Sequence, residues 1–278
     1  MSIDFRQCLY ALSDVVINRP SPLRLYDQIY MKLPDMLLQA EVMGRWFNGR
    51  SVAFIGDGDA IGLALAHLGT QRLIPGCPRR IHILDFDERI VHSVRNFASE
   101  HSIEGVISSE LYNVADPLPR EHWQEYDAFY TNPPWGAFNG GSSVRAFVNR
   151  GIEATKPRAW GSIVIGDHRD FSWTQEVLAC TQAHVQEAGF HVAEMLPEFH
   201  RYHLDDNPEI TSCCLIVRRE GGPSLSYASV PLNQDQLINF YGREAPLKAR
   251  YIRDLTFGGK QPSRDFIVEP YILKDHII

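Results

Sequence analysis

The sequence predicts an α/β fold in which seven strands form a mostly parallel sheet with helices on both faces. Two observations lead to this prediction. Short apolar runs alternate with helix-like segments from Val52 to about residue 218, and glycine or acidic residues directly follow several of the runs. Alternation of this kind joins neighbouring strands by crossover helices. Ligand-binding side chains are then expected beyond the carboxyl ends of the strands.

The elements follow from the periodicity of apolar residues. The expected strands span 52–56, 81–85, 106–112, 126–131, 160–166, 190–196 and 211–218, and the expected helices span 59–69, 88–101, 142–156 and 172–188. The connection before the last strand is short and polar, which favours an antiparallel final strand. Two helices are expected before the first strand. We therefore divide the chain into an N-terminal helical extension (1–50), a catalytic domain (51–220) and a C-terminal tail with few regular elements (221–278).

Composition narrows the class of protein. The 278 residues carry a formal net charge of −7. This argues against a protein whose main role is to bind the nucleic-acid backbone, because such binding needs basic patches. No apolar run reaches the roughly 18 residues of a membrane span, and the first residues lack the features of a signal peptide. We therefore expect a cytoplasmic protein with reduced cysteines. Cys213 and Cys214 lie in an apolar run and are expected to pack within a strand.

The turn after the first strand is Gly56-Asp57-Gly58-Asp59. Its glycines allow unusual backbone angles and a close approach of a ligand. Its two carboxylates suit a cation better than an anion. Asp59 alone could instead cap the following helix, but a cap needs only one carboxylate, so we expect Asp57 to have another role, in binding an ammonium group.

Two later strand ends carry further candidate residues. Asp85 stands at the end of the second strand, where an acid can accept both hydroxyls of a ribose, while Asp87 is expected to cap the next helix. The alternative for Asp85 is a solvated loop position. Tyr130-Thr131-Asn132-Pro133-Pro134-Trp135 ends the fourth strand. The Asn132 side-chain oxygen and the Pro133 carbonyl can accept hydrogen bonds from one amino nitrogen.

Trp135 can stack on a flat base or lie against a cation, or it can simply pack beside a diproline turn. Asp167, after the fifth strand, can contact an amine, although capping of the next helix by Asp170 explains this segment equally well. His200 and His203 lie three residues apart, yet no third ligand is fixed by spacing. We therefore expect no metal.

These features resemble class I methyltransferase-fold enzymes that alkylate amines, and the order of the motifs is similar to that of the branched-chain polyamine synthases. The resemblance covers roughly residues 19–218. It is carried by Arg19-Pro20-Ser21-Pro22, Asp27-Gln28-Ile29-Tyr30, the turn 56–59, Leu84-Asp85-Phe86-Asp87-Glu88-Arg89, Asp116-Pro117-Leu118-Pro119 and Arg145-Ala146-Phe147-Val148-Asn149-Arg150-Gly151-Ile152.

The resemblance implies transfer of aminopropyl groups from decarboxylated S-adenosylmethionine to the secondary nitrogen of spermidine. The family's Gly-Asp-Asp-Asp turn corresponds to residues 56–59, so Asp59 takes the catalytic position and Gly58 replaces an acid. The family's Asp-Pro-Pro appears as Asn132-Pro133-Pro134, and its adenine-side acid as Asn113. Asp205 and Asp206 would bind the amines of a polyamine from a mobile lid, unless they belong to a solvated loop. A homodimer through the N-terminal helices is expected by analogy.

Three functions remain open from the sequence. The first is an aminopropyltransferase in which Asp59 accepts the amine proton while Asn132 and Pro133 align the nitrogen. The second is a methyltransferase that uses intact S-adenosylmethionine on an amino group of adenine or another amine, which Asn132 and Trp135 favour. The third is a non-catalytic nucleoside-binding module.

Overall fold

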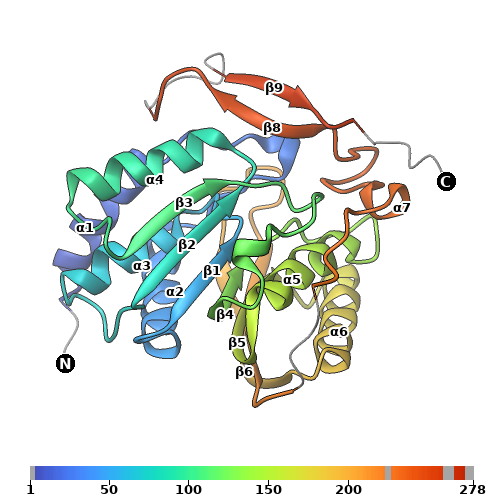
Figure 1. The fold of residues 1–278 in the computed structure, drawn as a ribbon, viewed down its shortest axis with the longest axis horizontal. Helices are drawn as coiled ribbons and strands as arrows, with labels where there is room; N and C mark the ends of the chain where they lie inside the picture. The colour runs from blue at the N-terminus through green and yellow to red at the C-terminus, as the bar shows by residue number, and fades with distance from the viewer. Residues whose placement is uncertain (1–3, 223–226, 259–265, 273–278) are drawn as a thin grey trace.

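The computed structural model describes residues 4–222, 227–258 and 266–272 (Figure 1). Its main sheet has seven strands in the order β3-β2-β1-β4-β5-β7-β6. β7 is antiparallel to both neighbours, and the other pairings are parallel. The predicted sheet, including its antiparallel final strand, is therefore confirmed.

The strands are β1 (Ser51–Ile55), β2 (Arg80–Asp85), β3 (Ile107–Leu111), β4 (Tyr126–Thr131), β5 (Thr155–Gly166), β6 (His191–Arg201) and β7 (Thr211–Arg219). The helices are α1 (Phe5–Asn18), α2 (Leu33–Trp46), α3 (Ile61–Thr70), α4 (Glu88–Glu100), α5 (Ser142–Ala154) and α6 (Ser172–Glu187). α3 begins two residues later than predicted because Ala60 adopts a left-handed conformation (φ 60°) before it.

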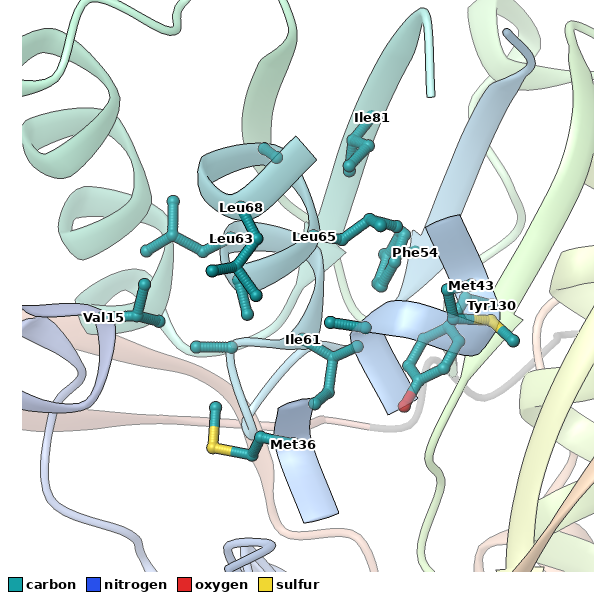
Figure 2. Close-up of a cluster of buried hydrophobic side chains, with 14 of the residues drawn as sticks. Val15, Met36, Met43, Phe54, Ile61, Leu63, Leu65, Leu68, Ile81 and Tyr130 are labelled. Carbon is teal, nitrogen blue, oxygen red and sulfur yellow. The ribbon is translucent and has the colours of Figure 1, made fainter. Parts of the chain in front are cut away.

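The two faces of β1 bury their side chains against different sets of helices. Val52 and Phe54 join a cluster formed with α1, α2, α3 and α4, which Figure 2 shows in part. Ala53 and Ile55 point to the other face, which α5 and the segment after β3 cover. Burial on both faces explains why β1 is apolar at every position except its first.

The tail contains more regular structure than the sequence predicts. α7 (Gln234–Leu237) is followed by the antiparallel pair β8 (Ala249–Asp254) and β9 (Phe266–Pro270), which lies across one end of the sheet, above α4 in Figure 1. The Ile252 amide donates to the Phe86 carbonyl, and Phe240 is fully buried beside α5. The expectation of a tail with few regular elements was incomplete because these contacts, rather than local periodicity, order the segment.

Cys213 and Cys214 are fully buried in β7, as the sequence predicts. No helix in the described parts of the chain combines the length and the apolar character that a membrane crossing requires.

Candidate active site

A cavity of about 660 Å³, including its mouth, opens where β1, β2 and β4 end. Besides the three strand ends, the chain segment before α2, the end of β6 and the tail contribute to its wall. Its lining residues are Tyr26, Asp27, Gln28, Ile29, Tyr30, Gly56, Gly58, Asp59, Asp85, Phe86, Asn132, Pro133, Pro134, Trp135, Phe147, Tyr202 and Tyr241. The structure thus brings three of the predicted strand-end motifs together at one site.

The two carboxylates of the turn after β1 have different hydrogen-bond partners. Both oxygens of Asp57 accept hydrogen bonds from the Gly62 amide, at 3.1 and 3.0 Å, in the first turn of α3. Asp57 is therefore the residue that satisfies the helix terminus, and its side chain does not line the cavity. The sequence-based assignment of Asp57 to an ammonium group is not supported, because its carboxylate is turned toward α3.

Asp59 faces the cavity instead. One oxygen accepts a hydrogen bond from the Met31 amide at 2.6 Å, and the other accepts one from the Asn132 side chain at 2.6 Å. Burial raises the pKa of Asp59, and the hydrogen bonds to Met31 and Asn132 together with the nearby Arg19 oppose part of that rise. A buried carboxylate with a raised pKa is suited to accept a proton.

The strand ends on either side of β1 supply the rest of the polar wall. Asp85 accepts hydrogen bonds from the Asp57 and Asp87 amides, both at 2.9 Å, which orient its carboxylate at the cavity. Burial and the adjacent Asp87 raise the pKa of Asp85 to about 7. Asp87 itself caps α4 through the Arg89 amide at 3.1 Å, as predicted.

The Asn-Pro-Pro-Trp segment lies directly against Asp59. The Asn132 oxygen faces the Trp135 indole nitrogen at 3.4 Å, and Trp135 meets Tyr202 edge to face with ring centres 5.2 Å apart. Pro133 and Pro134 line the cavity between them. An amine nitrogen entering here would meet polar groups on one side and aromatic rings on the others.

Sequence reasoning missed Asp27 as a site residue. It lines the cavity from the segment before α2, in a left-handed conformation (φ 57°), and burial raises its pKa to about 7. The Asp27-Gln28-Ile29-Tyr30 motif was the available signal, but its local pattern gives no reason to place it beside β1. Tyr241 was also missed, because it reaches the cavity from the tail.

Four predicted binding residues lie away from the cavity. The Asn113 amide donates to the Ala249 and Arg250 carbonyls at 3.2 and 2.6 Å, so it anchors β8 rather than facing a nucleoside. Asp167 accepts from the Gln175 side chain at 2.8 Å and from the Glu198 amide at 3.0 Å, on another surface.

Asp205 and Asp206 are exposed, and Asp206 pairs with Arg24 at 3.4 Å across the surface. The assignment of both acids to a binding lid is therefore not supported by their position, which matches the solvated-loop alternative. His200 is fully buried between Ser212 and Gln39, with its two ring nitrogens 2.9 and 2.8 Å from their oxygens. Its exposed neighbour His203 does not join it.

The charged residues that line the cavity are all acidic. Asp27, Asp59 and Asp85 line it, and none of the described residues in its wall is lysine or arginine. Arg19 stands behind Asp59, where its guanidinium packs on the Tyr30 ring at 4.1 Å. Such a cavity favours a ligand that carries positive charge on an aliphatic or aromatic body.

Proteins similar to this chain include named enzymes and solved structures. An N(4)-bis(aminopropyl)spermidine synthase of Thermococcus kodakarensis is 29% identical over 154 residues, which are 55% of this chain and 40% of that protein. A protein of the same name from Thermus thermophilus is 27% identical over 187 residues, 66% of this chain and 50% of that protein. The chain thus spans half the length, or less, of these curated relatives.

A solved branched-chain polyamine synthase from Thermus thermophilus, in complex with N4-aminopropylspermidine and 5'-methylthioadenosine, aligns with a TM-score of 0.67 and 22% identity, over 81% of this chain and 69% of that one. This likeness, with those to further solved structures, confirms the class I methyltransferase-like fold. Residues 7–239 match the family described as the branched-chain polyamine synthase A C-terminal domain. Because the match covers most of the chain, this protein belongs to that family.

Proposed function

We propose that this chain is an aminopropyltransferase whose donor is decarboxylated S-adenosylmethionine and whose acceptor is a polyamine such as spermidine. The observation that carries the proposal is the cavity with three carboxylates and no basic residue among those that line it. The names of the curated relatives, and the polyamine and 5'-methylthioadenosine in the solved relative, support the same reaction.

The electrostatics of the cavity bear on the choice of donor. Intact S-adenosylmethionine carries a carboxylate on its amino-acid arm, and the decarboxylated donor keeps only the ammonium there. One pair of unit charges at 4 Å is worth about 4 kcal/mol at an effective dielectric constant of about 20. Asp27, Asp59 and Asp85 would thus attract the ammonium of either donor and repel the carboxylate of only one.

Donor binding uses the ends of β1 and β2. Asp85 would accept hydrogen bonds from the ribose hydroxyls, because each oxygen keeps a lone pair beside its backbone partner. Gly56, at φ 75°, lets the backbone approach the nucleoside where a side chain would press on Phe147. Phe86 and Tyr241 offer apolar surface to a base.

The chemical step is an in-line displacement. The lone pair of the acceptor nitrogen forms a bond to the carbon beside the sulfonium, and the carbon–sulfur electron pair leaves on the sulfur of 5'-methylthioadenosine. An alkylamine with a pKa of about 10 is only about 0.1% neutral at pH 7, which costs roughly 4 kcal/mol. Asp59 accepts the proton, and the Asn132 oxygen and the Pro133 carbonyl hold the nitrogen in line.

A second function remains a candidate because of one observation. The Asn132-Pro133-Pro134-Trp135 segment places an amide oxygen and an indole at the cavity, an arrangement that suits a flat amino-bearing acceptor and methyl transfer from intact S-adenosylmethionine. The net charge of −7 supports small amines rather than nucleic acid as acceptors.

The test is a matched pair of reactions followed by mass spectrometry. Decarboxylated S-adenosylmethionine with spermidine is expected to give 5'-methylthioadenosine and an aminopropylated polyamine. Intact S-adenosylmethionine with spermidine or with adenine-containing acceptors is expected to give no methylated product. Methylated product without aminopropyl product would overturn the proposal in favour of the second function.

A further inference from the structure

A histidine–glutamate cluster lies on the other side of β2 from the α1–α4 helices, outside the cavity. His82 is in β2, Glu110 is in β3, and His122 ends a short 3-10 turn after β3. The Glu110 Oε2 atom lies 3.5 Å from His82 Nε2 and 3.1 Å from His122 Nε2. None of the three residues lines the candidate active site, and the proposed reaction uses none of them.

Hydroxyl groups hold the far nitrogen of each imidazole ring. His82 Nδ1 is 2.8 Å from the Ser108 hydroxyl, and His122 Nδ1 is 2.9 Å from the Tyr126 hydroxyl. When these hydroxyls accept the Nδ1 protons, both Nε2 lone pairs face Glu110. Metal-ligating histidines are oriented by this kind of second hydrogen bond.

One ring nitrogen of His82 is buried and has no hydrogen-bond partner. This nitrogen is Nε2, and the side chain is only 10% exposed. When Ser108 accepts the Nδ1 proton of His82, the buried Nε2 atom presents its lone pair to the Glu110 carboxylate oxygen at 3.5 Å. A cation between these two atoms would satisfy both of them.

The spacing of the three atoms suits a small metal ion. Zinc–nitrogen and zinc–oxygen bonds of about 2.0–2.1 Å in a tetrahedral site separate the ligand atoms by roughly 3.3 Å. The two distances to Glu110 bracket this value, and all three ligand atoms lie within 4.8 Å of one another. The Glu110 side chain is 41% exposed, so it can adjust and leaves room for water at a fourth position.

We propose that His82, Glu110 and His122 form a binding site for a divalent transition metal of the zinc type, with a water molecule as the fourth ligand. Two neutral imidazoles and one carboxylate leave a net charge of about +1 on the bound ion. The ion ties the turn that contains His122 to β2 and β3, and it satisfies the buried nitrogen of His82.

The test uses the full chain, stripped of metal with a chelator and titrated with Zn²⁺ against a chromophoric competitor. One equivalent of Zn²⁺ is expected to bind, and Co²⁺ is expected to give the visible absorption of a tetrahedral site. Glu110→Gln, which keeps the size of a partly exposed side chain, is expected to lower the affinity at least about tenfold. His122→Ala is expected to do the same and to remove the Co²⁺ spectrum.

His184→Asn is the matched control, because His184 is a half-buried histidine on α6 that bonds Asn149. It is expected to bind Zn²⁺ as the wild type does. The proposal is overturned if the wild type binds no stoichiometric Zn²⁺, or if Glu110→Gln and His122→Ala bind it with unchanged affinity. His122→Cys gives an independent check, because a thiolate ligand is expected to restore binding and to add a sulfur-to-Co²⁺ charge-transfer band.

Discussion

The cavity and the loop of residues 203–207 are both rich in carboxylates, yet they offer a ligand very different environments. Asp59 and Asp85 are buried beside aromatic rings, and burial raises the pKa of each. Asp205 and Asp206 are exposed, and Asp206 is paired with a surface arginine. Acidic residues thus favour a cationic ligand where water and basic side chains are excluded, and contribute little where both are present.

The turn after β1 offers a second comparison. Asp57 and Asp59 are two residues apart, but Asp57 satisfies the first turn of α3 while Asp59 faces Asn132 in the cavity. Ala60, in a left-handed conformation, follows Asp59 and leads the chain into α3. Asp57 and Asp59 are both buried, so their hydrogen-bond partners, rather than burial or the presence of a carboxylate, distinguish the binding acid from the structural one in this turn.

The largest effect is expected for Asp59→Asn, which keeps the shape of the residue and removes the proton acceptor. Turnover of the donor-saturated protein is expected to fall about 10²–10⁴-fold, because the substitution removes general-base assistance. Donor affinity is expected to fall as well, because Asp59 is one of the carboxylates that attract the donor ammonium. Single-turnover kinetics together with donor titration measure the two quantities. Asp206→Asn is the control, and turnover of Asp59→Asn within a factor of two of wild type would exclude Asp59 as the base.

The second-largest effect is expected on the pH dependence of stability and of donor affinity, through the titration of Asp85. The folded protein holds a proton on Asp85 up to about pH 7, whereas the unfolded chain releases it near pH 4, so the native state binds more protons in this window. The stability of the ligand-free protein is therefore expected to fall as pH rises from about 4 to about 7, and donor affinity is expected to rise over the same range.

Asp85→Asn checks this assignment. It is expected to reduce the stability change between pH 4 and 7, to which Asp27 also contributes because burial raises its pKa to about 7. It is also expected to lower donor affinity about 10- to 100-fold, because a hydrogen bond to a charged group is worth about 1.5–3 kcal/mol. Urea unfolding at several pH values and calorimetric titration measure both effects. An unchanged pH profile in Asp85→Asn would show that another group titrates there.

Gly56 and Gly58 offer a comparison within the turn. Gly56→Ala places a Cβ at φ 75° and 3.3 Å from the Phe147 ring, so we expect a loss of roughly 1–2 kcal/mol of stability. Gly58→Ala meets Tyr30 at an ordinary 3.7 Å, and its stability is expected to stay within about 0.5 kcal/mol of wild type. Equal losses in urea unfolding would contradict this difference.

The smallest effect is expected at the exposed loop. Asp205→Asn and Asp206→Asn are expected to change the KM for spermidine by less than about twofold, because exposed charges are screened by water and salt. Steady-state kinetics at physiological salt provide the measurement. A tenfold rise in KM for either variant would assign the loop a binding role after all.

The sequence predicted the seven strands, the antiparallel final strand and the approximate bounds of most central elements, because buried parallel strands are continuously apolar and the helices between them are amphipathic. It did not predict the order of the strands in the sheet. The Asn132-Pro133 segment was also placed correctly at the end of β4. The direction of Asp57 could not be predicted, since it depends on where the chain places the Gly62 amide after the turn. Contacts distant in sequence, such as Asp27 and Tyr241 at the cavity or His82 with His122, leave no local periodicity.

The central claim is that the buried carboxylates select a donor without a carboxylate of its own. Calorimetric titration of the wild-type chain with decarboxylated and with intact S-adenosylmethionine, at pH 8 and the same ionic strength, tests it most directly. Decarboxylated S-adenosylmethionine is expected to bind at least about tenfold more tightly, a difference of about 1.4 kcal/mol. Equal affinity, or tighter binding of the intact donor, would contradict the account.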